Sequence, residues 1–364
     1  MSAICAAVRG RSLPSESEQL KECLPRIIDW YAGSRRVLPW RQEPTPYHVW
    51  ISEIMLQQTR IEAAIAYYER FLRELPTVEA LAAVDEDRLM KLWEGLGYYS
   101  RARNLKKAAV LLTEQYGGQL PREAAVLKKL PGIGDYTAGA IASIAYGQPE
   151  PAVDGNVLRV LSRVLDSEED VLSPQTRRRM AALLREQYPT GERAGLLTEG
   201  LMELGETLCI PNGEARCELC PIRTHCLARA RNRVAELPVK AAPKARRMEE
   251  RTVLLLRCGD RWAIRRREAK GLLAGLWEYP NLLGHLTGQE AAAWAKAQGA
   301  EPLAWEDLGQ AVHVFSHVEW HMRGYRVDCD REAEGFLWAE SDAIAREYSI
   351  PTAFRFYHRQ VLEA

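Results

Sequence analysis

Residues 127 to 140 read Leu-Lys-Lys-Leu-Pro-Gly-Ile-Gly-Asp-Tyr-Thr-Ala-Gly-Ala, and this stretch decides the fold. It places two glycines, Gly132 and Gly134, between an apolar helical run and a second helix that we expect to begin near Asp135. A turn of this kind leaves backbone N–H groups at a helix N-terminus, where they can bind a phosphate. A Gly-x-Gly turn alone is equally typical of packing between a helix and a loop, but the whole Leu-Pro-Gly-Ile-Gly string is far more specific.

A carboxylate follows this hairpin at a defined distance. Asp154 lies twenty residues beyond Gly134, between a turn containing Pro149 and Pro151 and the start of another predicted helix. The dipole of that helix favours a negative charge at its first turn. An isolated Asp at such a place is usually an ordinary helix N-cap. Its position after the hairpin favours a functional carboxylate instead.

Four of the eight cysteines crowd into one short loop. Cys209, Cys217, Cys220 and Cys226 are separated by seven, two and five residues. A disulfide scaffold is typical of shorter chains with cysteines spread along them. The spacing therefore indicates a metal or an iron–sulfur cluster. Zinc sites commonly pair two Cys-x₂₋₄-Cys knuckles across a longer spacer, whereas this loop has a single two-residue gap.

Length and composition indicate a globular protein with more than one domain. The chain has 364 residues, of which 47% are apolar, so it can bury a substantial core. No stretch approaches the roughly 18 uninterrupted apolar residues that a membrane helix needs. The short apolar run near the N-terminus lacks the pattern of a signal peptide. We therefore expect a cytoplasmic protein that does not enter a membrane.

Apolar periodicity divides the chain in two. A capping box at Ser15 and Glu18 begins a helical part, and a change of character near residue 231 ends it. Predicted helices there cover about residues 85–94, 100–116, 134–146, 155–165, 174–187 and 192–208. Beyond them, 252–264 reads as a β-hairpin and 311–327 is rich in alternating β-formers. The predicted segments are an N-terminal extension at 1–17, an all-α domain at 18–230, a basic linker at 231–250 and an α+β domain at 251–364.

The charge balance conceals a gradient. The chain carries 49 Lys and Arg and 49 Asp and Glu, so its formal net charge is zero and gives no sign of a polyanionic partner. Residues 227–270, however, hold 14 basic side chains against 5 acidic ones, whereas 271–364 hold 7 against 14. The simplest interpretation of the basic stretch is a solvated linker, and its charge is also compatible with binding to nucleic acid.

The hairpin, the downstream Asp and the four-cysteine loop together resemble the endonuclease III superfamily of helix-hairpin-helix DNA glycosylases. Further motifs resemble the MutY-type adenine DNA glycosylases of that superfamily: Leu38-Pro-Trp-Arg41, Tyr47-His-Val-Trp-Ile-Ser-Glu-Ile-Met-Leu-Gln-Gln-Thr59, Trp93-Glu-Gly-Leu-Gly-Tyr-Tyr-Ser-Arg101 and Ala152-Val-Asp-Gly-Asn156. The C-terminal part is similar to the Nudix-like recognition domain of the family at residues 271–280 and 313–317. The resemblance covers about residues 20 to 360. It implies an all-α glycosylase module followed by an α+β Nudix-like domain.

The implied activity is hydrolysis of the N-glycosidic bond of adenine mispaired with 8-oxoguanine or guanine in double-stranded DNA, a step of base excision repair. Glu53, on an apolar helix, would have a raised pKa and act as general acid, and Asp154 would stabilise the positive sugar. Tyr136 stands where bifunctional members carry a Lys that forms a Schiff base. We therefore expect a monofunctional enzyme, with Tyr136 and Asn156 supporting Asp154 or the sugar.

The resemblance also implies the DNA contacts. It places Arg41 and Glu199 at the flipped adenine, Gln57, Gln58 and Tyr98 at the wedge and the opposite base, Gly132 and Gly134 at the backbone, and Phe315, Ser316 and His317 at 8-oxoguanine. A working Nudix hydrolase needs an acidic magnesium box. The residues after Gly288 read Gln-Glu-Ala-Ala-Ala-Trp-Ala-Lys, which argues against pyrophosphate hydrolysis.

The same resemblance implies a [4Fe–4S] cluster held by the four loop cysteines, with zinc as the alternative. The family's usual first gap is six residues, and we expect a turn near Gly213 to absorb the seventh. We further expect a monomer associated with the nucleoid of a bacterial cell. Two other functions stay open: a non-catalytic DNA-damage-binding protein, and a bifunctional glycosylase with lyase activity.

Overall fold

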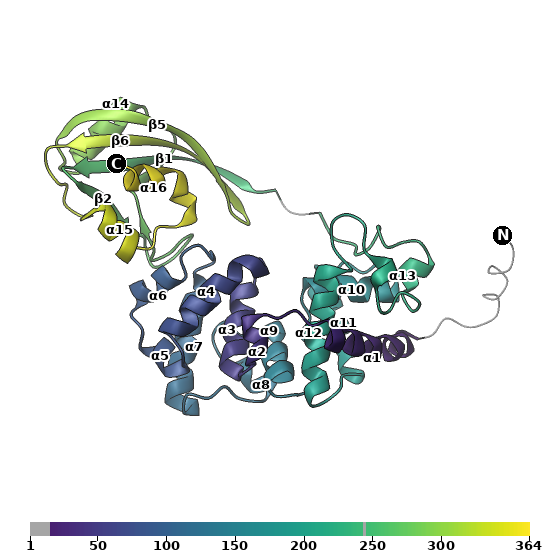
Figure 1. The fold of residues 1–364 in the computed structure, drawn as a ribbon. Coiled ribbons are helices and arrows are strands. Elements are labelled where there is room, and N and C mark those ends of the chain that lie inside the picture. The colour runs from purple at the N-terminus through teal and green to yellow at the C-terminus, as the bar shows by residue number, and fades with distance from the viewer. Residues whose placement is uncertain (1–14, 243–244) are drawn as a thin grey trace. The chain divides into compact units, whose positions relative to one another are not determined.

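A computed structural model describes residues 15–242 and 245–364, so residues 1–14 of the predicted extension and 243–244 of the predicted linker lie outside it. Contacts divide the chain into two compact units (Figure 1). The first comprises residues up to 72, 76–79 and 107–242, and the second comprises 73–75, 80–106 and 243–364. Within the described residues, no helix is both long and apolar enough to cross a membrane.

The first unit is helical, which confirms the all-α prediction. The helices predicted at 155–165, 174–187 and 192–208 are confirmed to within one residue at each end. Helices assigned wholly to this unit are α1 (Glu16–Ser34), α2 (Pro39–Gln42), α3 (Pro46–Leu56), α8 (Ala124–Leu127), α9 (Asp135–Ala140), α10 (Gly155–Leu165), α11 (Pro174–Glu186), α12 (Glu192–Thr207) and α13 (Leu227–Ala230). Helices α4 (Ile61–Glu74), α5 (Val78–Ala83) and α7 (Ser100–Tyr116) run through a boundary between the units.

A long apolar core holds helices α1, α10 and α12 together. The predicted capping box begins α1: the Ser15 hydroxyl accepts from the Glu18 N–H at 3.3 Å, and the Glu18 carboxylate accepts from the Ser15 N–H at 2.7 Å. Ile27 of α1, Leu158 of α10 and Leu197 of α12 belong to one buried cluster. Because α10 and α12 carry predicted site residues, this core fixes their separation.

The hairpin is formed as the sequence predicts. Helix α9 begins at Asp135, and Gly132 has a φ of 77°, in the region that favours glycine. The predicted run at 134–146 is not one regular helix, because a π-helix, η1 (Ile141–Ala145), follows α9. The Ser143 hydroxyl donates to the Gly139 carbonyl at 2.7 Å, and such a bond to the residue four earlier competes with the regular helical ladder.

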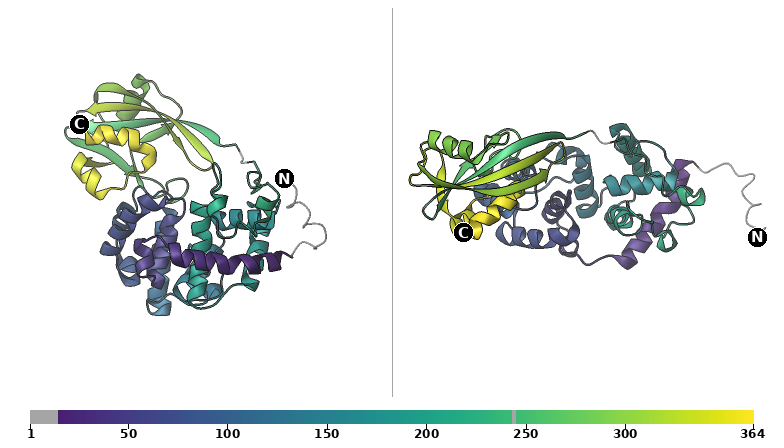
Figure 2. Two further views of the ribbon diagram at one scale, coloured as in Figure 1. Left: turned by 45° about the vertical axis from the view of Figure 1, so that its right-hand side comes forward. Right: turned by 90° about the horizontal axis from the view of Figure 1, so that it is seen from above.

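The second unit contains a mixed sheet with helices on both faces (Figure 2). Its strands are β1 (Arg247–Cys258), β2 (Arg261–Arg266), β3 (Trp277–Glu278), β4 (Asn281–Leu283), β5 (Pro302–Val314), β6 (Val318–Cys329) and β7 (Leu337–Glu340), in the order β3-β2-β1-β6-β5 with β4 beside β1 and β7 beside β2. Strands β1 and β6 are parallel, and the other pairs are antiparallel. The predicted hairpin at 252–264 is confirmed by β1 and β2. Residues 247–250, expected in the linker, are strand because they pair with residues 318–321 of β6.

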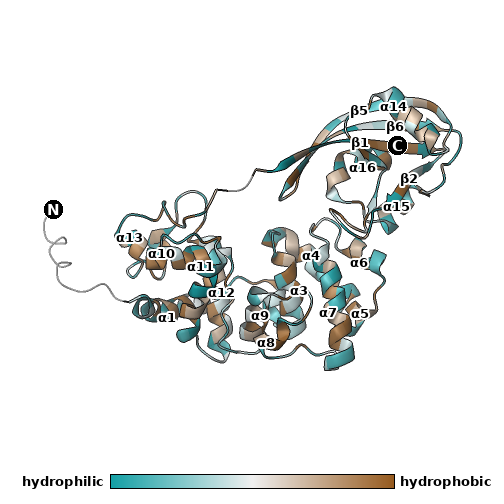
Figure 3. Cartoon of the chain, turned by 180° about the vertical axis from the view of Figure 1, so that it is seen from behind, coloured by the Kyte–Doolittle hydropathy of each residue, from teal (hydrophilic) through white to brown (hydrophobic). Residues whose placement is uncertain are grey.

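The middle of strand β1 is buried on both faces, which explains its continuous apolar run. Val253 and Leu255 pack in the cluster that includes Tyr357 of helix α16 (Arg355–Leu362). Leu254 and Leu256 pack on the other face, in the cluster that contains residues of helix α14 (Gly288–Ala297). A strand buried on both sides reads as uninterrupted hydrophobic sequence, and Figure 3 shows this middle part of β1 in brown. Helices α6 (Glu86–Leu92) and α15 (Ser341–Glu347) also belong to this unit.

A prediction tests the close packing between helix α9 and the segment that leads to Asp154. A Cβ atom at Gly139 would lie 2.3 Å from the carbonyl oxygen of Pro151. Gly139→Ala should therefore lower the free energy of unfolding by about 1–3 kcal/mol, measured by urea denaturation, because two backbone segments must separate. Gly33→Ala in α1, where a Cβ meets no atom within 4 Å, is the matched control and should be neutral or slightly stabilising. Equal unfolding midpoints for the two variants would contradict the close approach.

Candidate active site and cysteine pocket

Glu53 lies on helix α3, and its side chain is buried. The helix begins with Thr45 as its cap and Pro46 in its first turn, and it holds Glu53 at 6% exposure between the buried residues Ile51 and Ile54. Burial raises the pKa of the Glu53 carboxyl to about 7, as the sequence predicts. Nearby negative charges raise this pKa further, because a second carboxylate disfavours ionisation of the first.

The Tyr136 hydroxyl donates a hydrogen bond to Glu53. Its oxygen lies 2.5 Å from Oε2 of Glu53 and 3.5 Å from Sδ of Met202. Tyr136 is in the first turn of α9, so the glycine hairpin positions it. Burial raises the pKa of the Tyr136 phenol well above its ordinary value. The phenol therefore stays protonated near neutral pH and acts as a donor, which lowers the pKa of Glu53 against the effect of burial.

Asp154 both caps helix α10 and faces the pocket that contains Glu53. Its Oδ1 accepts from the Val157 N–H at 2.8 Å, and its Oδ2 accepts from the Asn156 amide at 3.0 Å. Burial raises the pKa of the Asp154 carboxyl, and these hydrogen bonds act in the opposite direction. The sequence could not reveal that burial, since the surroundings of Asp154 come from distant segments. Asn156 is itself held by Arg159, which donates to its Oδ1 at 2.8 Å.

A buried ion network fixes Arg41. Its guanidinium lies 2.9 Å from Oε2 of Glu203 and 3.4 Å from Oε1 of Glu199. Arg36 shares Glu203 and also pairs with Glu206 at 2.9 Å. The motifs indicated Arg41 and Glu199 but missed Glu203 and Arg36. Glu199, Glu203 and Glu206 recur at helical spacing along α12, and that spacing is the signal that could have revealed them.

Most of these groups line one pocket of about 610 Å³ in the first unit, whereas Arg36 and Glu203 are not part of its lining. It brings together the predicted residues Arg41, Glu53, Gln57, Gln58, Tyr136, Asp154, Asn156 and Glu199, with Arg177 and Met202 in addition. Gln57 lies at the end of α3, and its amide donates to the Thr137 hydroxyl at 3.4 Å. Gly132 and Gly134 do not line this pocket; they are exposed at the hairpin turn.

The remaining predicted DNA contacts lie in the second unit. Phe315, Ser316 and His317 form the turn between β5 and β6, and Ser316 and His317 are exposed. The Tyr98 and Ser316 hydroxyls are 2.8 Å apart, and the Phe315 ring lies 4.9 Å from the ring of Trp320. Tyr98 thus lines a pocket of about 740 Å³ with this turn, whereas Gln57 and Gln58 line the pocket of the first unit.

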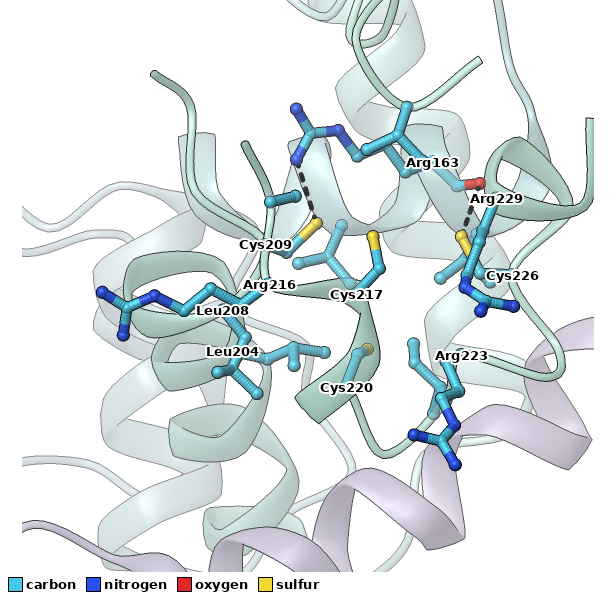
Figure 4. A pocket seen from close by; sticks show the side chains of 15 residues that line it. Arg163, Leu204, Leu208, Cys209, Arg216, Cys217, Cys220, Arg223, Cys226 and Arg229 are labelled. Atoms are coloured by element: carbon cyan, nitrogen blue, oxygen red, sulfur yellow. Dashed lines mark hydrogen bonds between the residues drawn. The ribbon is translucent and has the colours of Figure 1, made fainter. Parts of the chain in front are cut away.

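The four loop cysteines line a separate, small pocket of about 30 Å³ (Figure 4). Cys209 follows α12, Cys217 begins the short 3₁₀ helix η2 (Cys217–Leu219), and Cys226 caps α13. Arg163 Nη1 donates to the Cys209 sulfur at 3.2 Å, and the Cys226 thiol lies 3.4 Å from the Arg163 carbonyl oxygen. The longer first gap contains Gly213 with a φ of 79°, in agreement with the expected turn.

The cysteine thiols influence one another. Burial raises the pKa of Cys220 to about 12, and the neighbouring thiolates raise it further. Burial likewise raises the pKa of Cys226. Burial and mutual repulsion disfavour thiolates here, so all four cysteines would ionise together only with a compensating positive centre. No group of three or more His, Cys, Asp or Glu side chains in residues 15–242 and 245–364 is arranged to hold a single metal ion.

Comparisons with known proteins define the class. Residues 51–188 match the HhH-GPD superfamily of base excision DNA repair proteins, and residues 252–360 match the NUDIX domain. A solved thermostable thymine-DNA glycosylase is 26% identical, with a TM-score of 0.53, and the likeness covers 60% of this chain and 100% of that one. The fold and these matches define a base excision repair protein of the helix-hairpin-helix class with a Nudix-like C-terminal domain.

The sequence relatives define the family. The adenine DNA glycosylase of Rattus norvegicus is 32% identical, over 92% of this chain and 78% of the relative. That of Buchnera aphidicola subsp. Schizaphis graminum is also 32% identical, over 81% of this chain and 84% of the relative. The chain belongs to the adenine DNA glycosylase family, which confirms the resemblance predicted from its motifs.

The environment of Glu53 yields a prediction about the free protein. Its carboxyl should titrate near pH 7 rather than near the ordinary value of about 4.3. Tyr136→Phe removes the donor that stabilises the carboxylate, so the midpoint should rise. Infrared difference spectra of the carboxyl C=O stretch measure both midpoints, with Glu53→Gln as the reference that lacks the band. A wild-type midpoint below pH 5, or no rise in Tyr136→Phe, would show that the pair does not interact as described.

Proposed function

We propose that the chain is a monofunctional glycosylase that hydrolyses the bond between adenine and deoxyribose where adenine is mispaired with 8-oxoguanine or guanine in duplex DNA. The observation that carries the proposal is geometric: Glu53 and Asp154 line one pocket, and burial there raises the pKa of Glu53 to about 7. A carboxyl with this pKa can hold a proton at neutral pH and give it up during reaction. Family membership supports the choice of adenine.

The proposed reaction divides the work between the two carboxyl groups. Glu53 transfers its proton to a ring nitrogen of the adenine, which makes the base a neutral leaving group. Asp154, in its ionised form, stabilises the positive charge that develops on the sugar. The hydrogen bonds from Val157 and Asn156 support that ionised form. Water then adds to the sugar and loses one proton, which restores the Glu53 carboxylic acid, and an abasic site remains.

Arg41 and Glu199 are proposed to bind the flipped adenine. Enzymes that act on a base in DNA rotate it out of the stack into a pocket and read its edges by hydrogen bonds. Arg41 is buried and held by two carboxylates, so it presents a fixed donor geometry. Gln57 and Gln58, at the end of α3, would fill the space that the adenine leaves.

The proposal of monofunctional chemistry rests on Tyr136. A lyase needs an amine that attacks the sugar and forms a Schiff base. The hairpin instead presents a phenol whose pKa is raised by burial and which donates to Glu53. A neutral phenol cannot form a Schiff base, so we expect release of adenine without strand cleavage.

We propose that the β5–β6 turn reads 8-oxoguanine. Ser316 and His317 are exposed at its tip, and Tyr98 and Phe315 line the same pocket. A serine hydroxyl can both donate and accept. It therefore suits 8-oxoguanine, which differs from guanine by a new N–H donor and a new carbonyl acceptor.

We further propose a [4Fe–4S] cluster bound by Cys209, Cys217, Cys220 and Cys226. Four soft sulfur donors around one pocket, with Arg163 donating to the Cys209 sulfur, fit such a group. When bound, the cluster supplies four bonds that tie the loop of residues 209–226 to the end of α12. Since both proposed reading sites belong to one chain, we infer a monomer. We propose separately that it acts on chromosomal DNA in the bacterial cytoplasm.

One prediction concerns catalysis. Glu53→Gln cannot donate the proton, so the single-turnover rate of adenine release from an A:8-oxoguanine duplex should fall by a factor of about 10² to 10⁴. Binding to the mispair should persist. Glu69→Gln, an exposed glutamate of α4, is the matched control and should react at the wild-type rate. In the wild type the rate should decline above about pH 7 as Glu53 loses its proton. Near-normal turnover in Glu53→Gln would remove it from the mechanism.

The same assay separates the alternative functions. Wild-type protein on A:8-oxoguanine, A:G and A:C duplexes should release adenine fastest from the first. Strand cleavage without added alkali, together with borohydride trapping, would indicate a bifunctional lyase. Specific binding without any release of adenine would indicate a damage-binding protein.

Another prediction concerns the cofactor. Purified protein should contain about four iron and four sulfide per chain if the four thiolates bind one cluster. Cys217→Ser should lose most of this iron, whereas Cys258→Ser, whose side chain is outside the cysteine pocket, should retain it. Stoichiometric zinc without iron would refute the cluster.

A further inference from the structure

Arg177 is a cation at the proposed reaction site that the motifs did not indicate. It lies near the start of helix α11 and lines the same pocket as Asp154. Thr176 and Met180 of this helix are buried, at 4% and 1% exposure, so they fix the backbone that carries Arg177. Its side chain is exposed and can meet a ligand that enters the pocket.

The contacts of Arg177 differ from those of Arg179 and Arg185 on the same helix. Arg177 Nη1 donates to the carbonyl oxygen of Val153 at 3.3 Å, one residue before Asp154. Arg179 is paired with Glu16 and Glu169, and Arg185 is paired with Glu150. In the part of the chain that the structure describes, the charge of Arg177 is not matched by a carboxylate within 4 Å. The Val153 contact holds its guanidinium beside Asp154 and uses one of five N–H donors.

The carboxyl groups of the pocket favour a free cation where an anionic ligand enters. Four of them line it: Glu53, whose pKa is about 7, Asp154, and Glu199 and Glu206, which are paired with arginines. The other lining cation, Arg41, is committed to Glu199 and to Glu203. A DNA strand that enters brings further negative charge, and like charges at short range repel strongly where water is excluded.

We infer that Arg177 binds a backbone phosphate directly adjoining the sugar of the flipped adenosine. The inference rests on the proposed function, which places Asp154 against that sugar. The phosphates on either side are joined to the same sugar, so a guanidinium anchored one residue from Asp154 is within reach of one of them. Arginine binds phosphate through paired, charge-assisted N–H bonds. Arg177 thereby holds the sugar against Asp154 and offsets the repulsion between phosphate and carboxylates.

This interaction should favour every mispair equally, because a phosphate carries no sequence information. Arg177→Gln should therefore weaken binding to A:8-oxoguanine and A:G duplexes by the same factor. The slope of log Kd against log salt concentration should fall by about 0.9, the value expected when one phosphate is no longer neutralised by the protein. Arg177→Lys, which keeps the charge, should retain most of that slope.

The deciding experiment replaces single phosphates by neutral methylphosphonates. Full-length protein is titrated with an A:8-oxoguanine duplex whose target is 2′-fluoro-adenosine, which resists hydrolysis. Each phosphate flanking this nucleotide is replaced in turn. One replacement should weaken wild-type binding by about tenfold or more, as expected when a charged hydrogen bond is removed, and the penalty should disappear in Arg177→Gln. Arg178→Gln is the matched control: this exposed neighbour does not line the pocket and should keep the full penalty.

The outcomes distinguish the inference from the function on which it rests. The phosphate contact is overturned if methylphosphonate weakens binding equally in wild type and Arg177→Gln. It is also overturned if neither replacement weakens wild-type binding. Neither result affects the glycosylase assay, which tests the proposed function separately. A wild-type protein that binds A:8-oxoguanine no more tightly than A:T overturns both. Thermal unfolding of the variants, expected to match wild type because the side chain is exposed, excludes misfolding as the cause of any loss.

Discussion

The hydrogen bond from Tyr136 to Glu53 joins the hairpin to helix α3. The protonation of Glu53 depends on this bond and on the burial of its carboxyl group. Burying a charged carboxylate away from water costs free energy, and protonation removes the charge and with it most of that cost. Burial raises the pKa of Glu53 to about 7, and the charges of Asp154 and Glu199 act in the same direction. The phenol lowers the pKa again by stabilising the anion. The two opposed effects leave a carboxyl group that can both hold and release a proton at neutral pH, which a general acid requires.

Asp154 shows that a structural role and a chemical role can be met by the same hydrogen bonds. As the N-cap of α10 it satisfies the Val157 N–H, which would otherwise lack a partner at the helix end. The bonds that cap the helix also oppose the effect of burial on its pKa. The sequence suggested a choice between an ordinary cap and a functional carboxylate. In the structure, one carboxylate oxygen of Asp154 caps the helix and the other accepts from Asn156. The helix end therefore helps to keep the Asp154 carboxylate ionised.

Local patterns predicted the local structure, and long-range contacts account for what they missed. The capping box at Ser15, the hairpin glycines and the boundaries of α10 depend on neighbours within a few residues, so sequence was sufficient there. The grouping of residues 80–106 with the C-terminal unit depends on contacts such as Lys91 Nζ with the Tyr348 carbonyl, 257 residues away. The periodicity of the sequence gives no sign of a contact between residues so far apart. The burial of Asp154 escaped prediction for the same reason.

The ion network around Arg41 is best understood through its effect on the Glu53 proton. Buried ion pairs add little stability, since desolvation of both partners offsets their attraction, so stability alone does not explain why Glu203 is buried at 3% exposure with two arginines. The positive charge of Arg41 lowers the pKa of Glu53. Pairing with Glu203 and Glu199 neutralises much of that charge and holds the guanidinium in one orientation. An unpaired Arg41 would favour the Glu53 anion and lower the pKa of that carboxyl further. The network therefore holds a cation in the same pocket as Glu53 while limiting how far that cation lowers the pKa of Glu53.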